Sequence, residues 1–96
     1  MSMNEVFRAL GDPTRREVLR LLRQRDMTAG EIAERFPLAK STLSGHFAVL
    51  KQAGLLVAER RGTSIVYSLN TSVFEEALAS VLALLRASGD RQGRKR

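Results

Sequence analysis

Apolar residues recur with a helical period in the first part of the chain. Over residues 4–10 they stand at positions i, i+1 and i+4, in a segment too short to form a stable helix alone. Gly11 ends this segment. Asp12-Pro13 then offers a side-chain acceptor at an N-cap, followed by proline at the first helical position. We therefore predict a second helix over 13–23, with buried residues Val18, Leu19, Leu21 and Leu22.

One arginine falls inside the apolar arc of this second helix. Arg15 lies between Val18 and Leu19 on a helical wheel, and a buried guanidinium needs a hydrogen-bonding or charged partner. We interpret Arg15 as structural, with its stem packed and its head against a carboxylate such as Asp12 or a neighbouring backbone carbonyl. A contact with a ligand or a phosphate is the alternative.

A helix-turn-helix pattern follows over residues 28–54. Thr28 and Glu31 have the spacing of a capping box, in which each side chain accepts a hydrogen bond from the other's backbone N–H. A short helix therefore begins directly after Thr28. Pro37 cannot continue that helix. The residues after it complete a turn of about three to four residues, the length that a helix-turn-helix uses.

The second helix of this pair is predicted over 40–53, because Gly54 is the residue type that usually follows a helix end. Its apolar face holds Leu43, Phe47, Leu50 and Ala53. Its opposite, small and polar face holds Ser41, Ser44, Gly45 and Ala48, with Gln52 at the end. Small hydroxylic residues let a helix approach a DNA groove and hydrogen-bond phosphates or base edges. An ordinary amphipathic surface helix with a tolerated glycine would show the same pattern.

The period of the pattern changes from 3.6 to 2 after Gly54. Segments 55–60 and 65–69 are predicted as strands around Arg61-Gly62-Thr63-Ser64, and glycine in a four-residue connection indicates a hairpin. A hairpin directly after a helix-turn-helix is the layout of a winged helix. Arg60 and Arg61 lie at its tip, where they could reach phosphates or an adjacent minor groove. Exposed arginines at a turn also serve solubility alone.

The last predicted helix follows Asn70, with Ser72 and Glu75 at capping-box spacing. Its apolar side chains fill about half of a helical wheel, more than the roughly 100° that a helix needs to cover its own core. We therefore predict self-association through this helix and the first one, although a larger monomer core is the alternative. The predicted interface residues are Val6, Phe7, Leu10, Phe74, Leu78, Val81, Leu82 and Leu85. A C2 dimer would place two reading helices roughly 34 Å apart over an inverted repeat.

Composition narrows the classes of function. The 96 residues form one domain over 1–87 and a basic segment over 88–96 that we expect to be disordered. The net charge of +6 favours a polyanionic partner such as nucleic acid. The absence of cysteine excludes disulfides and thiolate metal sites. No apolar run suits a signal peptide or a membrane span, so we expect a cytoplasmic protein without membrane insertion.

Taken in order, these segments resemble the ArsR family of bacterial winged-helix repressors over about residues 4–85. The segments that carry the resemblance are ALGDPTRR, TAGEIAERF, STLSGHF, LKQAGLL and the wing over 61–69. Within the family, the chain is most similar to the SdpR-type autorepressor branch. That similarity lies in MTAGEIAE, LKQAG and YSLNTSVF.

The resemblance implies a mainly helical, homodimeric winged helix-turn-helix with the order α-α-α-α-β-β-α, bound to double-stranded DNA. The reading helix over 40–53 and the wing over 60–64 would make the contacts. The expected DNA-binding residues are Lys40, Ser41, Thr42, Ser44, Gly45, His46, Arg60, Arg61 and Thr63. Gly45 departs from the family pattern, since many members carry a larger polar side chain there. His46 lies at the border of the buried arc, so a core-edge role is its alternative.

Well-known members of the family release DNA when they bind metal, through cysteines on the reading element or Asp and His residues along the final helix. This chain has no cysteine, and its final helix offers Glu75 and Glu76, about 100° apart. We therefore predict no metal site and no cofactor. Control would come from a protein partner, an organic ligand at the dimer interface, or expression level alone.

The sequence thus predicts a dimeric, metal-independent transcriptional repressor that binds an inverted-repeat operator. The alternative is a winged-helix protein-interaction module without specific DNA reading. An enzyme is poorly supported, because the chain has one histidine, no cysteine nucleophile and no glycine-rich phosphate loop.

Overall fold

Over residues 2–95, which the structure describes, the computed structural model contains five helices and three strands; side chains are described through residue 86. The elements are α1 (Met3–Leu10), α2 (Pro13–Gln24), β1 (Met27–Thr28), α3 (Ala29–Ala33), α4 (Lys40–Gln52), β2 (Leu56–Arg61), β3 (Ser64–Leu69) and α5 (Thr71–Lys95). The predicted order of helices and strands is confirmed, with β1 as an additional short strand.

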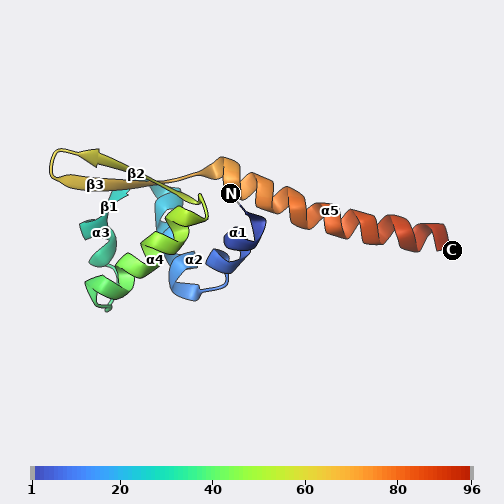
Figure 1. Ribbon diagram of the computed structural model, residues 1–96, viewed down its shortest axis with the longest axis horizontal. Helices are drawn as coiled ribbons and strands as arrows, with labels where there is room; N and C mark the ends of the chain where they lie inside the picture. The colour runs from blue at the N-terminus through green and yellow to red at the C-terminus, as the bar shows by residue number, and fades with distance from the viewer. Residues whose placement is uncertain (1, 96) are drawn as a thin grey trace.

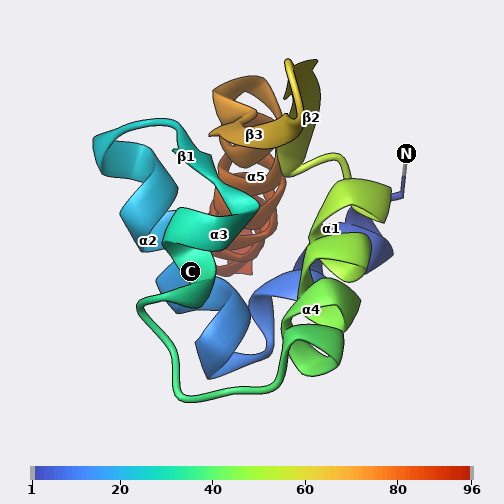
Figure 2. The ribbon, with the colours of Figure 1, turned by 90° about the vertical axis from the view of Figure 1, so that its left-hand side faces the viewer.

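The first four helices and the sheet form one body, and α5 projects away from it (Figure 1). Helices α1, α2 and α4 pack against one another. In Figure 2, α3 lies beside β1, and α4 lies next to α1 on the other side of the body. This arrangement leaves the outer side of α4 uncovered by other elements.

The core fills the space enclosed by α1, α2, α4 and the sheet. Its largest fully buried side chains are Val6, Val18, Ile32, Leu43, Leu50 and Leu55. Phe47 of α4 packs on Tyr67 of β3, with ring centroids 4.9 Å apart and ring planes at 40°. Burial of the predicted apolar faces of α2 and α4 is confirmed, because all eight of their named residues belong to this core.

Side-chain caps fix the starts of three helices. Asp12 accepts a hydrogen bond from the Arg15 backbone N–H at 3.0 Å, which confirms its N-cap role at α2. The capping box of α3 is also confirmed, since Thr28 Oγ1 lies 3.1 Å from the Glu31 N and Glu31 Oε1 lies 2.8 Å from the Thr28 N. A further capping box, formed by Ser2 and Glu5, starts α1. The S-x-x-E spacing would have predicted it.

The turn between α3 and α4 is longer than predicted. Helix α3 ends at Ala33, so residues 34–39 connect it to α4. Pro37 disfavours helical geometry in the residue before it. After Ala33 the backbone makes hydrogen bonds of the 3₁₀ type, in which an N–H donates to the carbonyl three residues earlier. They run from Arg35 N to Ile32 O at 2.9 Å and from Phe36 N to Ala33 O at 3.3 Å.

The three strands form an antiparallel sheet in the order β1-β3-β2. Arg61 pairs with Ser64, so the wing turn consists of Gly62 and Thr63 alone and is tighter than the predicted four-residue connection. Gly62 has a φ of +63°, which suits the first central position of a two-residue hairpin turn. Strand β1 was not predicted, because two residues are too few to show a period.

Helix α5 begins at Thr71, so Ser72 lies inside its first turn, and the predicted capping box at Ser72 is wrong. Val73 and Ala77 pack into the core. The helical backbone extends to Lys95, past the predicted start of the basic segment. The side chains of that segment lie outside the described residues, and its assignment as a separate tail stays a prediction.

Candidate nucleic-acid interface

Helix α4 presents a small, polar surface, which we call the reading face. It consists of the exposed residues Lys40, Ser41, Thr42, Ser44 and Gly45. These residues point outward because the opposite side of α4 is anchored in the core through Leu43, Phe47 and Leu50. At the start of α4, Ala39 provides no side-chain cap. The first N–H groups of the helix, which have no partner within it, therefore remain available to an anion such as a phosphate.

Gly45 stands in open space on the reading face. A Cβ added at this position would have nothing within 4 Å. Packing within the chain therefore does not require a glycine here. Its effect is to keep the middle of the reading face flat, next to the hydroxyl group of Ser44.

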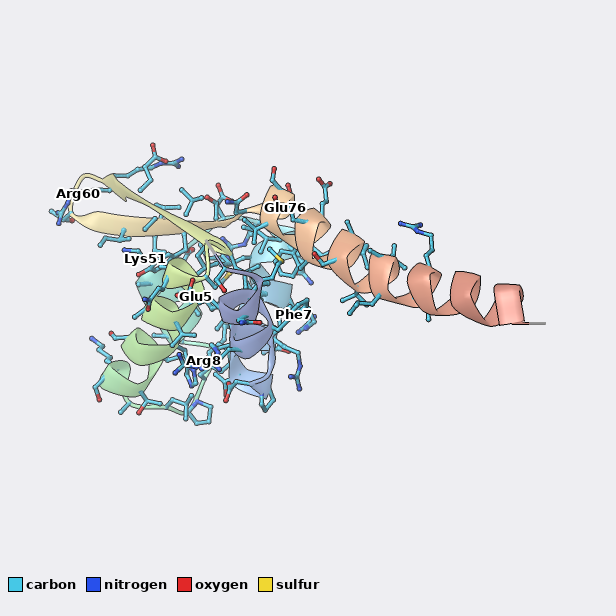
Figure 3. All side chains as sticks on the ribbon, turned by 45° about the vertical axis from the view of Figure 1, so that its right-hand side comes forward. Glu5, Phe7, Arg8, Lys51, Arg60 and Glu76 are labelled. Atoms are coloured by element: carbon cyan, nitrogen blue, oxygen red, sulfur yellow. The ribbon has the colours of Figure 1, made fainter. Side chains whose placement is uncertain are left out.

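The outer side of α4 continues toward the wing. A shallow groove of about 200 Å³ is lined by Ser44, Phe47, Ala48, Lys51 and Tyr67, and so links α4 to β3. Figure 3 shows Lys51 on α4, and Arg60 far from α5, near the end of the hairpin. The predicted wing residues Arg60, Arg61 and Thr63 are all exposed. The fold thus brings the reading face and the wing onto neighbouring parts of one surface.

Arg61 pairs with a carboxylate of its own strand. Its Nη2 lies 3.0 Å from Glu59 Oε1, and the two side chains are 61% and 63% exposed. An ion pair this exposed contributes little to stability. The guanidinium can therefore leave Glu59 for a stronger anionic partner at little cost.

Arg15 of α2 makes contacts with both α1 and α4. Its Nε donates to the Ala9 carbonyl oxygen at 2.8 Å, and its Nη2 donates to the Arg8 carbonyl oxygen at 3.1 Å. Its Nη1 lies 3.2 Å from Nδ1 of His46 on α4. The predicted structural role with backbone carbonyls as partners is therefore confirmed. Asp12, the other predicted partner, accepts from the Arg15 backbone N–H instead of the guanidinium.

His46 lies near two charged groups at the start of α2, Asp12 and Arg15. Its side chain is 17% exposed, and its Nδ1 lies 3.8 Å from Asp12 Oδ2 as well as near Arg15. The pKa of the Asp12 carboxyl is held below its usual range, mainly because the Arg15 backbone N–H donates to it; the charges of His46 and Arg15 add to this effect. No local sequence signal links Arg15 to His46, because the two residues are 31 positions apart.

The predicted dimer residues divide into exposed and buried groups. On α5, Leu78, Val81, Leu82 and Leu85 are exposed, at 59%, 45%, 40% and 68%. Phe7 on α1 is exposed too, while Leu10 and Phe74 are half-buried. A shallow apolar cavity of about 230 Å³ is lined by Phe7, Leu10, Phe74, Ala77, Leu78 and Val81.

Val6 does not belong to this exposed set. Its side chain is 0% exposed and lies in the core of its own chain. On a short helix its neighbour Phe7 points outward instead, as Figure 3 shows. Val6 therefore supports the position of α1 but offers no surface to a second chain.

No three His, Cys, Asp or Glu side chains come together as metal ligands within the described residues. Glu75 and Glu76 are both exposed at the start of α5. In the part of the chain that the structure describes, no helix has the length and apolar character needed to cross a membrane.

Comparison with known proteins places this geometry in a family. Residues 12–57 match the family described as bacterial regulatory protein, arsR family. The chain is 50% identical over 76 residues to the transcriptional repressor SdpR of Bacillus subtilis (strain 168), covering 79% of this chain and 84% of that protein.

Solved structures agree with this assignment. An ArsR-like transcriptional regulator from Rhodococcus sp. RHA1 has a TM-score of 0.80 and 30% identity, with 94% of this chain and 84% of that chain covered. M. tuberculosis Rv0081 has a TM-score of 0.69 and 33% identity, with 92% and 90% covered. These relatives are regulators of transcription rather than enzymes. The chain therefore belongs to the ArsR family of bacterial regulatory proteins and is a winged helix-turn-helix, DNA-binding regulator of transcription.

Proposed function

We propose that this chain is a homodimeric transcriptional repressor that binds an inverted-repeat operator without the help of a metal ion. The reading face of α4 enters the major groove, and the wing lies along the adjacent phosphates. The observation that carries this proposal is the joint exposure of the reading face and the basic wing on neighbouring parts of one surface.

The two parts of this surface have different chemistry. Ser41, Thr42 and Ser44 bring hydroxyl groups that both donate and accept hydrogen bonds, as contacts to base edges require. Arg60 and Arg61 bring charge, which attracts any phosphate backbone regardless of its sequence. The helix therefore supplies specificity, and the wing supplies affinity.

Exposed leucines on α5 support the homodimer. Leu78, Leu82 and Leu85 share one side of the helix and are between 40% and 68% exposed in a single chain. Packing two copies of α5 together would remove this apolar surface from water. A twofold axis through the paired helices gives two reading faces related by symmetry, and hence an operator with an inverted repeat.

Two observations support independence from metal. The chain has no cysteine. Within the described residues, the acidic side chains and the histidine do not form a group of three. Repression is proposed because the relative SdpR is named a transcriptional repressor. A protein partner or an organic ligand at the dimer interface remains the candidate for control.

The test is selection of bound duplexes from random-sequence DNA, followed by footprinting of the selected site. We expect an inverted repeat whose half-site centres are about 10 base pairs apart, with protection symmetric about its centre. Binding to every duplex alike, with affinity set by salt alone, would contradict specific reading. A reporter gene downstream of the selected site should be transcribed less when the protein is present, and increased transcription would contradict repression.

A further inference from the structure

The Arg15 guanidinium connects α1 to the middle of α4. The carbonyl oxygens of Arg8 and Ala9, which it binds, belong to the last turn of α1, where Arg8 O also accepts the Gly11 backbone N–H. Its third contact, 3.2 Å from Nη1 to His46 Nδ1, reaches α4. One side chain of α2 therefore satisfies the end of one helix and fixes the position of another.

The contact between Arg15 and His46 requires a neutral imidazole. A guanidinium has only donors, so Nδ1 must be the unprotonated nitrogen and accept the hydrogen bond, which leaves the proton on Nε2. Protonation of the ring would turn Nδ1 into a donor and place a second positive charge beside Arg15. The protonated ring would then face the Asp12 carboxylate, whose Oδ2 lies 3.8 Å from Nδ1.

The charged groups around the imidazole are few. Arg15 of α2 and Asp12, the N-cap of that helix, face it. From α1, Glu5 and Arg8 approach α4 near Val49 and Gln52, further along the helix. Strand β2, which also packs against α4, has its charged residues toward the wing, in segment 59–61. The charge state of His46 therefore acts mainly on Arg15 and Asp12.

We propose that Arg15 and His46 are positioning residues for DNA binding. The hydrogen bond from Arg15 to neutral His46 fixes the position of α4 relative to α1 and α2. Protonation of His46 breaks this hydrogen bond and weakens DNA binding. His46 directly follows Gly45 of the reading face, so a shift of α4 at this point moves the groups that contact DNA. This inference rests on the proposed role of α4 as the reading helix.

A direct contact of His46 with DNA predicts the opposite pH dependence. A histidine that binds phosphate does so as a cation, so its contribution would grow as the pH falls. The positioning contact exists only for the neutral ring, so binding should weaken as the pH falls. The sign of the pH effect therefore separates the two roles.

The experiment measures the affinity of the full chain for a labelled duplex that carries the selected site, at about pH 7 and about pH 5.5 and constant ionic strength. We expect binding about three- to tenfold weaker at the lower pH, because a protonated Nδ1 cannot accept the hydrogen bond from Arg15. The chain has one histidine, so His46→Gln should abolish this pH dependence. Tighter binding at the lower pH, or no change, would overturn the proposal.

A pair of arginine variants tests the other side of the contact. Arg15→Gln should weaken binding about tenfold at pH 7 and flatten the pH dependence, because the bond from a charged donor to His46 is lost. Arg16→Gln is the matched control. Arg16 also donates to a carbonyl at the end of α1, from Nη1 to Leu10 O at 2.8 Å, but it is exposed and has no hydrogen bond to α4. An equal effect of both substitutions would contradict a specific role for Arg15.

Imidazole nitrogen NMR tests the proposal without DNA and guards against variants that fold poorly. The single histidine gives one pair of ring-nitrogen signals. Near pH 7.5 we expect the tautomer with its proton on Nε2, and a proton on Nδ1 would overturn the proposal. Specific binding at pH 7 that does not respond to pH would refute the Arg15–His46 proposal while leaving the proposed function intact. Failure to select any site would refute the proposed function itself.

Discussion

Asp12 caps the start of α2 and lies near His46. Its carboxylate caps the helix by accepting the Arg15 backbone N–H at 3.0 Å, and its Oδ2 lies 3.8 Å from His46 Nδ1. The cap lowers the pKa of the Asp12 carboxyl in the folded chain. The ionised form therefore stabilises the fold more than the protonated form does.

The sign of the resulting pH dependence follows from this lowered pKa. The contribution of Asp12 is fully present above the ordinary aspartate pKa of about 3.9 and is lost as the pH falls through the lower, folded value. Asp12→Ala should cost about 1 kcal/mol of unfolding free energy at pH 7, because alanine cannot cap.

Urea unfolding of the original chain, Asp12→Ala and Asp12→Asn at pH 7 and about pH 3 measures this contribution. Asparagine caps about as well as aspartate but does not titrate, so it separates the cap from its charge. The gap between the original chain and Asp12→Ala should narrow in acid. A gap that widens in acid would contradict a lowered pKa for Asp12 in the folded chain.

The reading face and the wing should respond differently to mutation. Arg61→Ala should weaken binding to all duplexes by a similar factor and reduce the slope of log affinity against log salt by about 1, as loss of one phosphate contact predicts. Ser44→Ala should instead change the preference among variants of the selected site, because Ser44 lies on the reading face, which we propose enters the major groove.

Binding titrations with the selected site and its variants, over a range of salt concentrations, measure both effects. Arg20→Ala is the matched control for Arg61→Ala: Arg20 is 59% exposed and pairs with Glu17, but it lies on α2 instead of the wing. It should leave the affinity and the salt slope unchanged. Loss of affinity at one base position only, on replacing Arg61, would contradict its proposed phosphate contact.

Elements with strong local signals could be predicted from the sequence. The caps at Asp12 and Thr28 and the two faces of α4 follow from short-range spacing, and the structure agrees. Features that depend on pairing between distant segments could not be predicted from the sequence. Strand β1 exists only because Met27 and Thr28 pair with β3. The two-residue turn of the wing follows from the positive φ of Gly62, which spacing alone does not fix.

The same distinction applies to the candidate site. The small, exposed residues of α4 were predictable from helical period, because their counterparts on the opposite side had to be buried. The contact of Arg15 with His46 was not predictable from the sequence, since it forms only once α2 and α4 have packed together. An apolar pattern does not tell which side of a short helix faces its own core, so Val6 could not be separated from Phe7 as a dimer residue.

At the scale of the whole molecule, α5 gives the chain its elongated shape of 60 × 24 × 22 Å. Val73 and Ala77 attach the start of α5 to the core, while Leu78, Val81 and Leu82 remain exposed beyond it. Exposing these leucine side chains to water on a projecting helix is unfavourable for a single chain. Pairing with a second copy would cover this surface.

Leu82→Glu should therefore dissociate the proposed dimer, because it would bury a charge in an apolar interface. Sedimentation equilibrium should show the mass falling from about twice 10.7 kDa to 10.7 kDa. Ala83→Glu is the control, because Ala83 is exposed and shares the polar side of α5 with Glu76. An unchanged mass for Leu82→Glu would show that the interface lies elsewhere.

The most direct test of specific, metal-independent operator binding is a titration of the labelled selected duplex with the protein, in excess competitor DNA, with either EDTA or zinc added. We expect competitor-resistant binding by two chains per site, with the same affinity under both conditions. Binding that the competitor abolishes would contradict specific reading by α4, and binding that zinc or EDTA changes would contradict independence from metal.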